Sequence, residues 1–183
     1  GALRTEGATE LVLDLRYNGG GLVDVAVHLA SLIGGVVTNG QVMMTYSHSD
    51  RAATLNKVTR FDNPEQALTL RRLVAITTRS SASASELVIN ALRPYIEVVV
   101  IGDTTYGKPV GQCGITFCDK VLAAVSFTLR NANDEGDYFD GIAPTCAAPD
   151  DWSHQLGDTA EGSLAEALTY IRTGACSAVA QGA

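Results

Sequence analysis

The chain alternates short apolar runs with segments of helical periodicity, and this alternation restricts its fold more than any other feature. Three runs have the length and β-branched content of buried strands: ELVLDLR (residues 10–16), RLVAITTR (72–79) and EVVVIG (97–102). Between them, residues 21–35 and 83–96 carry apolar side chains at helical spacing, with stop signals at Gly34–Gly35 and at Pro94. Successive strand, helix and strand units predict an α/β layered fold with parallel pairing in at least its first half.

The rest of the chain extends this pattern within one domain. Further strands are expected at QVMMTYSH (41–48), CDKVLAAVSFTLRNA (118–132) and GDYFDGIAPT (136–145), and a C-terminal amphipathic helix at SLAEALTYIRTG (163–174). The polar segment 49–66 is expected to cross the surface. The 183 residues suffice for one full core, and no repeat or second domain is visible. Because the chain begins at Gly1, close to a predicted strand, we expect residues 1–183 to be a fragment of a longer protein.

The charge balance excludes several classes of partner. Thirteen basic residues stand against twenty acidic ones, a net charge of -7, and there is no run of Lys or Arg. Nucleic acid and anionic lipid would therefore be repelled overall. No apolar segment approaches the roughly 18 to 20 residues that a membrane span needs, and no leader pattern opens the chain.

The four cysteines predict disulfides and no metal site. They lack the spacing of zinc ligands, and no histidine lies near a pair of them. An even count permits two disulfides, and we expect Cys113–Cys118, across a tight turn, and Cys146–Cys176, in an oxidising compartment. The alternative is four buried free thiols.

The segment DLRYNGGG (14–21) places three glycines between a strand and a helix. Backbone N–H groups near a helix N-terminus favour an anion or a developing oxyanion. The spacing fits neither common phosphate-binding motif, so a nucleotide site is disfavoured. The alternative is that the glycines only permit a tight turn.

A cluster of four serines, in TTRSSASASELVINALRPY (77–95), lies where a strand ends and a helix begins. Ser83 and Glu86 fit the S-x-x-E capping box, so Ser83 can be a helix cap. A serine at such a junction is also where hydrolases expose a nucleophile beside amides that stabilise an oxyanion. The G-x-S-x-G motif of α/β-hydrolases is absent.

Lys108 lies in a loop, GDTTYGKPVGQ (102–112), directly after an apolar strand. A lysine is a general base only when neutral, and lowering a lysine pKa from about 10.4 to near 7 or 8 costs roughly 3 to 4 kcal/mol, which burial can supply. The alternative is an ordinary surface lysine. The three histidines have no motif around them, which disfavours a Ser-His-acid triad, and S-x-x-K is absent.

Together these segments resemble the C-terminal processing peptidases, or tail-specific proteases, of the Clp protease/crotonase superfamily. The family's D-L-R-x-N-x-G-G matches Asp14 to Gly21, and its S-A-S-A-S-E matches Ser81 to Glu86. Its G-x-T-x-G-K matches Gly102 to Lys108, with Thr104 or Thr105 as the threonine. The resemblance covers about residues 10 to 145.

The resemblance implies a crotonase/Clp-protease-like layered β-α-β core with a mixed sheet, and a Ser-Lys mechanism without a cofactor. Ser83 would be the nucleophile, Lys108 the base and Gln112 the residue that orients it, while backbone amides of Gly20 and Ala84 would form the oxyanion hole. An aspartate that some members carry eleven residues after the serine is replaced by Pro94.

The expected function is therefore a serine endopeptidase acting on unfolded or C-terminal segments of polypeptides. The family's usual PDZ domain is not found in these 183 residues and is expected elsewhere in the full-length chain, as a possible regulatory partner. The resemblance also implies the bacterial cell envelope, with the periplasm or another extracytoplasmic space as location. The alternative is a non-catalytic peptide- or ligand-binding module of the same fold, whereas an acyl-CoA enzyme is disfavoured by the acidic charge balance.

Overall fold

A parallel sheet forms the centre of the molecule. The computed structural model describes residues 1–178. The sheet has the order β1-β4-β5-β8 and consists of β1 (Glu10–Asp14), β4 (Arg72–Thr77), β5 (Glu97–Gly102) and the short β8 (Cys146–Ala147). All three pairings are parallel, and Leu11, Leu73 and Val98 lie side by side in the register. The central strands β4 and β5 are largely buried because helices cover both faces of the sheet, whereas β1, at its edge, is half-buried.

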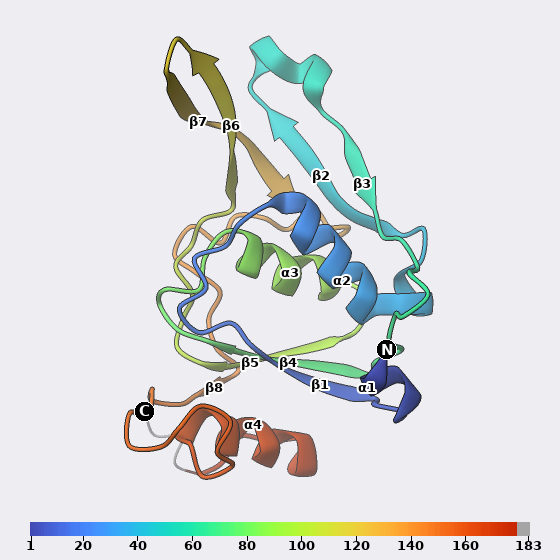
Figure 1. Ribbon diagram of the computed structural model, residues 1–183, viewed down its shortest axis with the longest axis vertical. Helices are drawn as coiled ribbons and strands as arrows, with labels where there is room; N and C mark the ends of the chain where they lie inside the picture. Colours follow the sequence, from blue (N-terminus) through green and yellow to red (C-terminus); the bar gives the residue numbers. More distant parts are fainter. Residues whose placement is uncertain (179–183) are drawn as a thin grey trace.

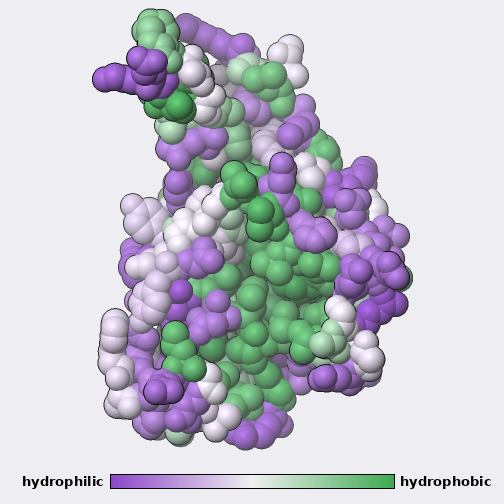
Figure 2. All heavy atoms as spheres, viewed as in Figure 1, coloured by the Kyte–Doolittle hydropathy of each residue, from purple (hydrophilic) through white to green (hydrophobic). Residues whose placement is uncertain are grey.

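Two helices cover one face of this sheet and one covers the other (Figure 1). The helices α2 (Val23–Thr38) and α3 (Ala84–Leu92) lie together on one side, and α4 (Gly162–Thr173) lies on the opposite side. A short helix, α1 (Ala2–Thr5), precedes β1. Apolar side chains gather on the outer face over α2 and α3 (Figure 2). The result is the layered α/β core that the alternation predicts.

A second, antiparallel sheet projects beyond the layered core (Figure 1). Its order is β3-β2-β7-β6, with β2 (Val42–His48), β3 (Val58–Arg60), β6 (Val110–Phe117) and β7 (Lys120–Arg130). The 3₁₀ helix η1 (Asp50–Leu55) joins β2 to β3, in the segment expected to cross the surface. The α/β fold class is confirmed, with parallel and antiparallel pairing placed in separate sheets.

Two sequence-based expectations about local structure are wrong. GDYFDGIAPT (136–145) is an irregular loop, in which the chain turns at Gly141 with a φ of 98°. Ile142 of this loop fills space beside the core, where it is buried with Leu15 and Val100, rather than pairing with a strand, and Phe139 is exposed. Conversely, β6 was not expected, because Gly111 and Gly114 weaken its pattern.

The first long helix bends at the glycines that were expected to end it. Gly35 has a φ of 52°, and helical structure resumes and continues to Thr38. A Cβ on Gly35 would lie 1.8 Å from the carbonyl oxygen of Leu68, so only glycine allows this close approach. The predicted close of α4 at Gly174 is confirmed, with Gly174 in the left-handed conformation.

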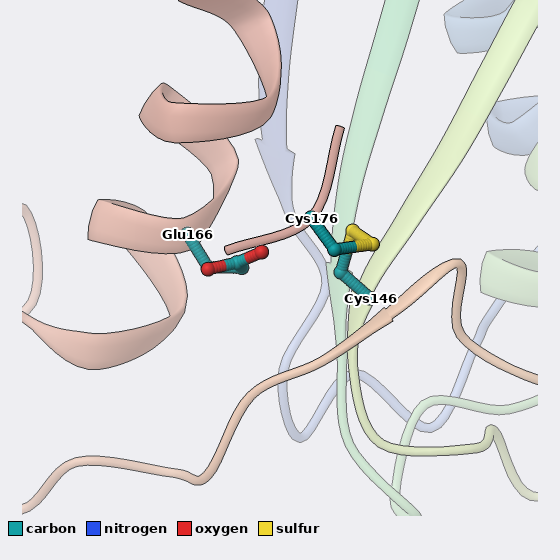
Figure 3. A group of neighbouring side chains, drawn as sticks. All are labelled: Cys146, Glu166 and Cys176. Atoms are coloured by element: carbon teal, nitrogen blue, oxygen red, sulfur yellow. A yellow bond between two sulfur atoms is a disulfide. The ribbon is translucent and has the colours of Figure 1, made fainter. Parts of the chain in front are cut away.

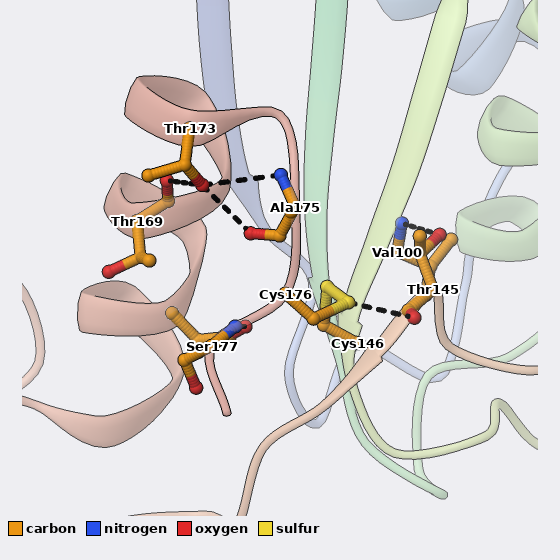
Figure 4. Close-up of a disulfide and its surroundings, with 9 residues drawn as sticks. Val100, Thr145, Cys146, Thr169, Thr173, Ala175, Cys176 and Ser177 are labelled. Carbon is orange, nitrogen blue, oxygen red and sulfur yellow. Dashed lines mark hydrogen bonds between the residues drawn. A yellow bond between two sulfur atoms is a disulfide. The ribbon is translucent and has the colours of Figure 1, made fainter. Parts of the chain in front are cut away.

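One of the two expected disulfides is present. Cys146 and Cys176 are bonded, with their Cα atoms 5.5 Å apart, and they connect β8 to the segment after α4 (Figure 4). Cys113 and Cys118 are free and exposed, so their expected pairing is wrong. Cys113 lies in β6 opposite Ala124, and the tight turn follows only after Phe117, so an extended strand separates the two thiols.

Within residues 1–178, no helix combines the length and the apolar character that a membrane span requires.

Candidate active site

The glycine turn follows β1 and is fixed by a buried arginine. Arg16 donates to both carboxylate oxygens of Asp14 and, at 2.8 Å, to Glu161, which caps the N-terminus of α4. The hydrogen bond to Asp14 outweighs burial and raises the pKa of Arg16. The D-L-R part of the motif is therefore structural, because it anchors the turn to the helix on the other face of the sheet.

The serine cluster follows β4, and its members have different roles. Ser81 is fully buried and donates to the carbonyl of Leu15 at 2.7 Å. Ser85 is also buried and donates to the carbonyl of Asn18 at 3.0 Å. Both hydroxyls thus tie the serine loop to the glycine turn. Ser80 is exposed and lines a separate hollow at the ends of β4 and β5.

Ser83 is the serine that lines the candidate pocket. It is half-buried, at the N-cap of α3, with a φ of 56° and a ψ of -114°. A non-glycine residue with positive φ is strained, and such strain is common where a side chain is held for chemistry. The next residue, Ala84, is the first residue of α3, and its backbone N–H has no hydrogen-bond acceptor within residues 1–178.

Gly20 brings the glycine turn against Ser83. Its φ is 98°, and a Cβ there would lie 2.7 Å from the Ser83 Cβ and 2.8 Å from the Ala84 nitrogen. The backbone N–H of Gly20 donates to Asn18 Oδ1 at 3.0 Å, whereas Gly19 and Gly21 line the pocket. The glycine turn therefore lies directly against Ser83 and Ala84, and the Gly20 N–H already has an acceptor within the turn.

A single carboxylate joins the serine loop to the lysine loop. Glu86, which is fully buried, accepts from the backbone N–H of Ser83 at 2.8 Å and of Lys108 at 2.9 Å. It also accepts from the Gly107 N–H at 2.6 Å and from Thr105 Oγ1 at 2.5 Å. Each of these bonds crosses from α3 to the loop after β5, except the one to Ser83, so Glu86 sets where both loops lie.

The contacts of Thr105 identify it, rather than Thr104, as the threonine of the G-x-T-x-G-K motif. It is fully buried, and besides donating to Glu86 it accepts from the Ile142 N–H at 2.7 Å. Thr104 is partly exposed and lies against Asp103.

The sequence predicted Glu86 only as part of a capping box and of the serine motif. Its position three residues after the N-cap indicated a bond to the Ser83 N–H, but nothing local indicated its bonds to the lysine loop.

Ser83 and Lys108 lie in the wall of one pocket of about 310 Å³. Its remaining lining is mainly apolar, from Leu22, Val23, Leu87, Val110, Phe127 and Leu129. Tyr138 completes the wall, and burial, together with the nearby Glu86 charge, raises the pKa of its phenol, so it keeps its proton. Phe127 and Tyr138 had no local signal in the sequence, because their side chains reach the pocket only through the tertiary fold.

Gln112 lines the same pocket but is turned toward the antiparallel sheet. Its Nε2 donates to the carbonyl of Ala123 at 3.2 Å, across the hairpin. A register shift between Gly111 and Gln112 lets β6 change direction there, as contact with Lys108 would require. None of the three histidines lines the pocket, so within the described residues the geometry does not support a Ser-His pair.

One group of potential metal ligands lies away from this pocket. Cys146, Cys176 and Glu166 gather beside α4 (Figure 3), but the two sulfur atoms are bonded to each other. Disulfide sulfurs are not thiolates, and the carboxylate of Glu166 is already an acceptor for the Ser177 N–H. The group is therefore a structural disulfide next to a hydrogen-bonded carboxylate.

Comparison with known families and proteins agrees with this geometry. The model of peptidase family S41 matches residues 1–148. A carboxy-terminal-processing protease of Bartonella bacilliformis is 34% identical over 141 residues, which are 73% of this chain and 29% of that protein. The chain thus spans less than a third of this relative's length.

Two solved structures share the fold. A candidate S41 protease from Bacteroides fragilis superposes with a TM-score of 0.85 at 32% identity, covering 94% of this chain and 47% of that one. The photosystem II D1 C-terminal processing protease superposes with a TM-score of 0.61 at 24% identity, covering 78% of this chain and 35% of that one. The second likeness concerns the fold alone.

Proposed function

This chain belongs to peptidase family S41, and we propose that it is the catalytic core of a serine endopeptidase that uses a Ser83–Lys108 pair. The observation that carries the proposal is that Ser83 and Lys108 line one pocket while Glu86 holds the backbone of both. Three independent loops converge there. The positive φ of Ser83, the half-buried Lys108 and an Ala84 N–H that has no acceptor within residues 1–178 all occur at this pocket, and together they support the proposal.

The proposed reaction begins when Ser83 Oγ attacks the scissile carbonyl carbon and its proton passes to the Lys108 amine, which is the proposed base. The negative charge that develops on the carbonyl oxygen is stabilised by the Ala84 N–H and by an amide of the glycine turn, at Gly20 or its neighbour. Lys108 then protonates the leaving amine. Water hydrolyses the acyl-serine ester in the second half, with Lys108 again as the base.

The lining of the pocket indicates the class of substrate. Its apolar side chains would accept a small or medium apolar residue of the polypeptide next to the scissile bond. Unfolded or C-terminal segments are the substrates proposed for the whole protein, since only an extended chain can place its backbone against loops on both sides of Ser83. Gln112 is proposed to orient Lys108 after leaving its bond to Ala123.

The proposed location is the bacterial cell envelope, outside the cytoplasm. The Cys146–Cys176 disulfide supports this location, because such bonds persist in oxidising compartments. A PDZ or other regulatory domain in the full-length protein belongs to the same proposal.

The test is covalent labelling of the purified chain with a fluorophosphonate probe, followed by mass spectrometry of the labelled peptide. We expect the label on Ser83, its loss in Ser83→Ala, and at least tenfold slower labelling in Lys108→Arg, which keeps the charge but cannot act as a base. Ser80→Ala, an exposed serine of the same loop outside the pocket, is the matched control.

Casein digestion by the same proteins extends the test to peptide bonds. Label on Ser80 or Ser85, or equal labelling of Lys108→Arg and the parent chain, would refute the Ser-Lys assignment. Binding of apolar peptides without any labelling would instead support the non-catalytic module.

A further inference from the structure

The outer part of the β6–β7 hairpin is a two-stranded ribbon that no other element covers. We define the ribbon as residues 112–125, which project beyond the rest of the antiparallel sheet (Figure 1). β7 pairs with β2 only through Phe127 to Arg130, so in the described structure both edges of the ribbon are open. A two-stranded ribbon alone is marginally stable in water.

The ribbon is also apolar where it is exposed. Its large exposed hydrophobic side chains are Ile115, Phe117, Val121, Leu122 and Val125. Phe117 is 77% exposed, and green spheres are visible at this projecting end in Figure 2. Ile115 and Phe117 belong to β6 itself, so a strand added along this edge would lie against their exposed surface.

The edge of β6 lacks the features that protect sheet edges. Val110–Phe117 contains no charged residue and no proline, whereas the β7 strand begins with Lys120 next to Asp119. Charged side chains and proline are the usual means by which exposed edges avoid pairing. β6 is therefore the edge that is open to another strand.

The most complementary partner for such an edge is its own copy. Around a two-fold axis, antiparallel pairing offers each strand the N–H and C=O groups it lacks. The protein carries a net charge of -7, which opposes self-association at most surfaces, but β6 is uncharged and brings no like charges together.

We propose that two copies of this chain associate by antiparallel pairing of β6 with β6, centred on Cys113. A two-fold axis through Cys113, one of the two middle residues of the eight-residue strand, pairs residues 110–116 of the two copies and places the two Cys113 residues opposite each other. Directly opposite residues have Cα atoms about 4.5–5.5 Å apart, within the range that a disulfide spans. Cys113 is free and exposed, so it reports on the pairing.

The same register gives the pairing a consequence for the pocket. Val110 and Gln112 line the pocket, so the paired segment of each copy begins beside that copy's own pocket.

The test is the oligomeric state in reducing buffer, measured by sedimentation over a concentration series. We expect a dimer whose dissociation constant rises at least about tenfold in Cys113→Asp, because two like charges then face each other at the two-fold axis. Cys118→Asp makes the same change at the other free cysteine, which lies in the turn, and should change the constant less than twofold.

A second arm traps the register. Diamide takes up two electrons and two protons from a pair of thiols, and we expect it to yield a Cys113–Cys113 covalent dimer in Cys118→Ser but none in Cys113→Ser. A monomer at all concentrations, equal weakening by both aspartates, or cross-linking through Cys118 would overturn the proposal. So would a monomer that binds phosphatidylcholine vesicles, which would assign the ribbon to a lipid surface.

Discussion

Gly19 and Gly20 are neighbours in one turn, yet only Gly20 has no room for a side chain. A Cβ on Gly20 would meet Ser83 and Ala84, and its φ of 98° disfavours any other residue, whereas a Cβ on Gly19 meets nothing within 4 Å. Gly20→Ala should therefore displace the serine loop and slow probe labelling of Ser83 at least tenfold. Gly19→Ala should label within about twofold of the parent chain. Equal rates in the two variants would contradict the close approach.

Glu86 is the residue whose removal should have the largest structural effect at the site. Glu86→Ala leaves the backbone N–H groups of Ser83, Gly107 and Lys108 without their acceptor, and each unsatisfied buried donor costs about 1–3 kcal/mol. We expect the free energy of unfolding in urea to fall by at least about 3 kcal/mol. Glu6→Gln, at an exposed position, is the control and should change it by less than about 0.5 kcal/mol. A fall of similar size in both variants would contradict the bridging role.

The loop before α4 contains the clearest pH-sensitive pair. The hydrogen bond between His154 and Asp151, 2.7 Å long, raises the pKa of His154 above 6.5. Because the folded pKa is the higher one, this pair stabilises the fold fully below pH 6.5, and the contribution is lost as pH rises through the folded value. NMR titration of the His154 ring should give a pKa above 6.5 that Asp151→Asn lowers. An unchanged titration in that variant would show that the pair is not formed in solution.

At the scale of elements, the disulfide holds α4 against the parallel sheet. Cys176 follows α4, Cys146 lies in β8, and 30 residues separate them in sequence (Figure 4). Closing a loop of this size stabilises a fold by about 3–4 kcal/mol in the chain-entropy model. The double change Cys146→Ser and Cys176→Ser should lower the urea midpoint accordingly, and reductant should then have no further effect.

The matched control for the disulfide is the double change Cys113→Ser and Cys118→Ser. These thiols are free and exposed, so the urea midpoint of the monomer at low concentration should stay within error of the parent chain. If reductant leaves the urea midpoint of the parent chain unchanged, the Cys146–Cys176 disulfide contributes nothing to stability.

At the scale of the whole molecule, the site lies where the two sheets meet. Ser83 and the glycine turn come from the layered core, whereas Gln112 and Phe127 come from the antiparallel sheet that projects from it. Only contacts between the sheets bring these side chains to one pocket. The same projecting sheet carries the ribbon through which we propose that two copies associate.

Much of the core followed from the sequence alone. The strands β1, β4 and β5 and the helices α3 and α4 have apolar periodicity and end signals that are local, so a window of about ten residues suffices to predict them. The motif order likewise placed Ser83 and Lys108 in loops after parallel strands. These features can be predicted locally because apolar residues recur along a helix or strand with the fixed period of that element, on each face that it buries.

Tertiary structure decided what depends on distant partners. Ser81 and Ser85 were excluded as pocket residues only by their bonds to the glycine turn, and Glu86 became a bridge only through the lysine loop. The loop at 136–145 and the unpaired Cys113 were wrongly predicted, because strand pairing and turn position depend on neighbours across the sheet. Periodicity determines which face of an element is buried, whereas the fold determines what lies against that face.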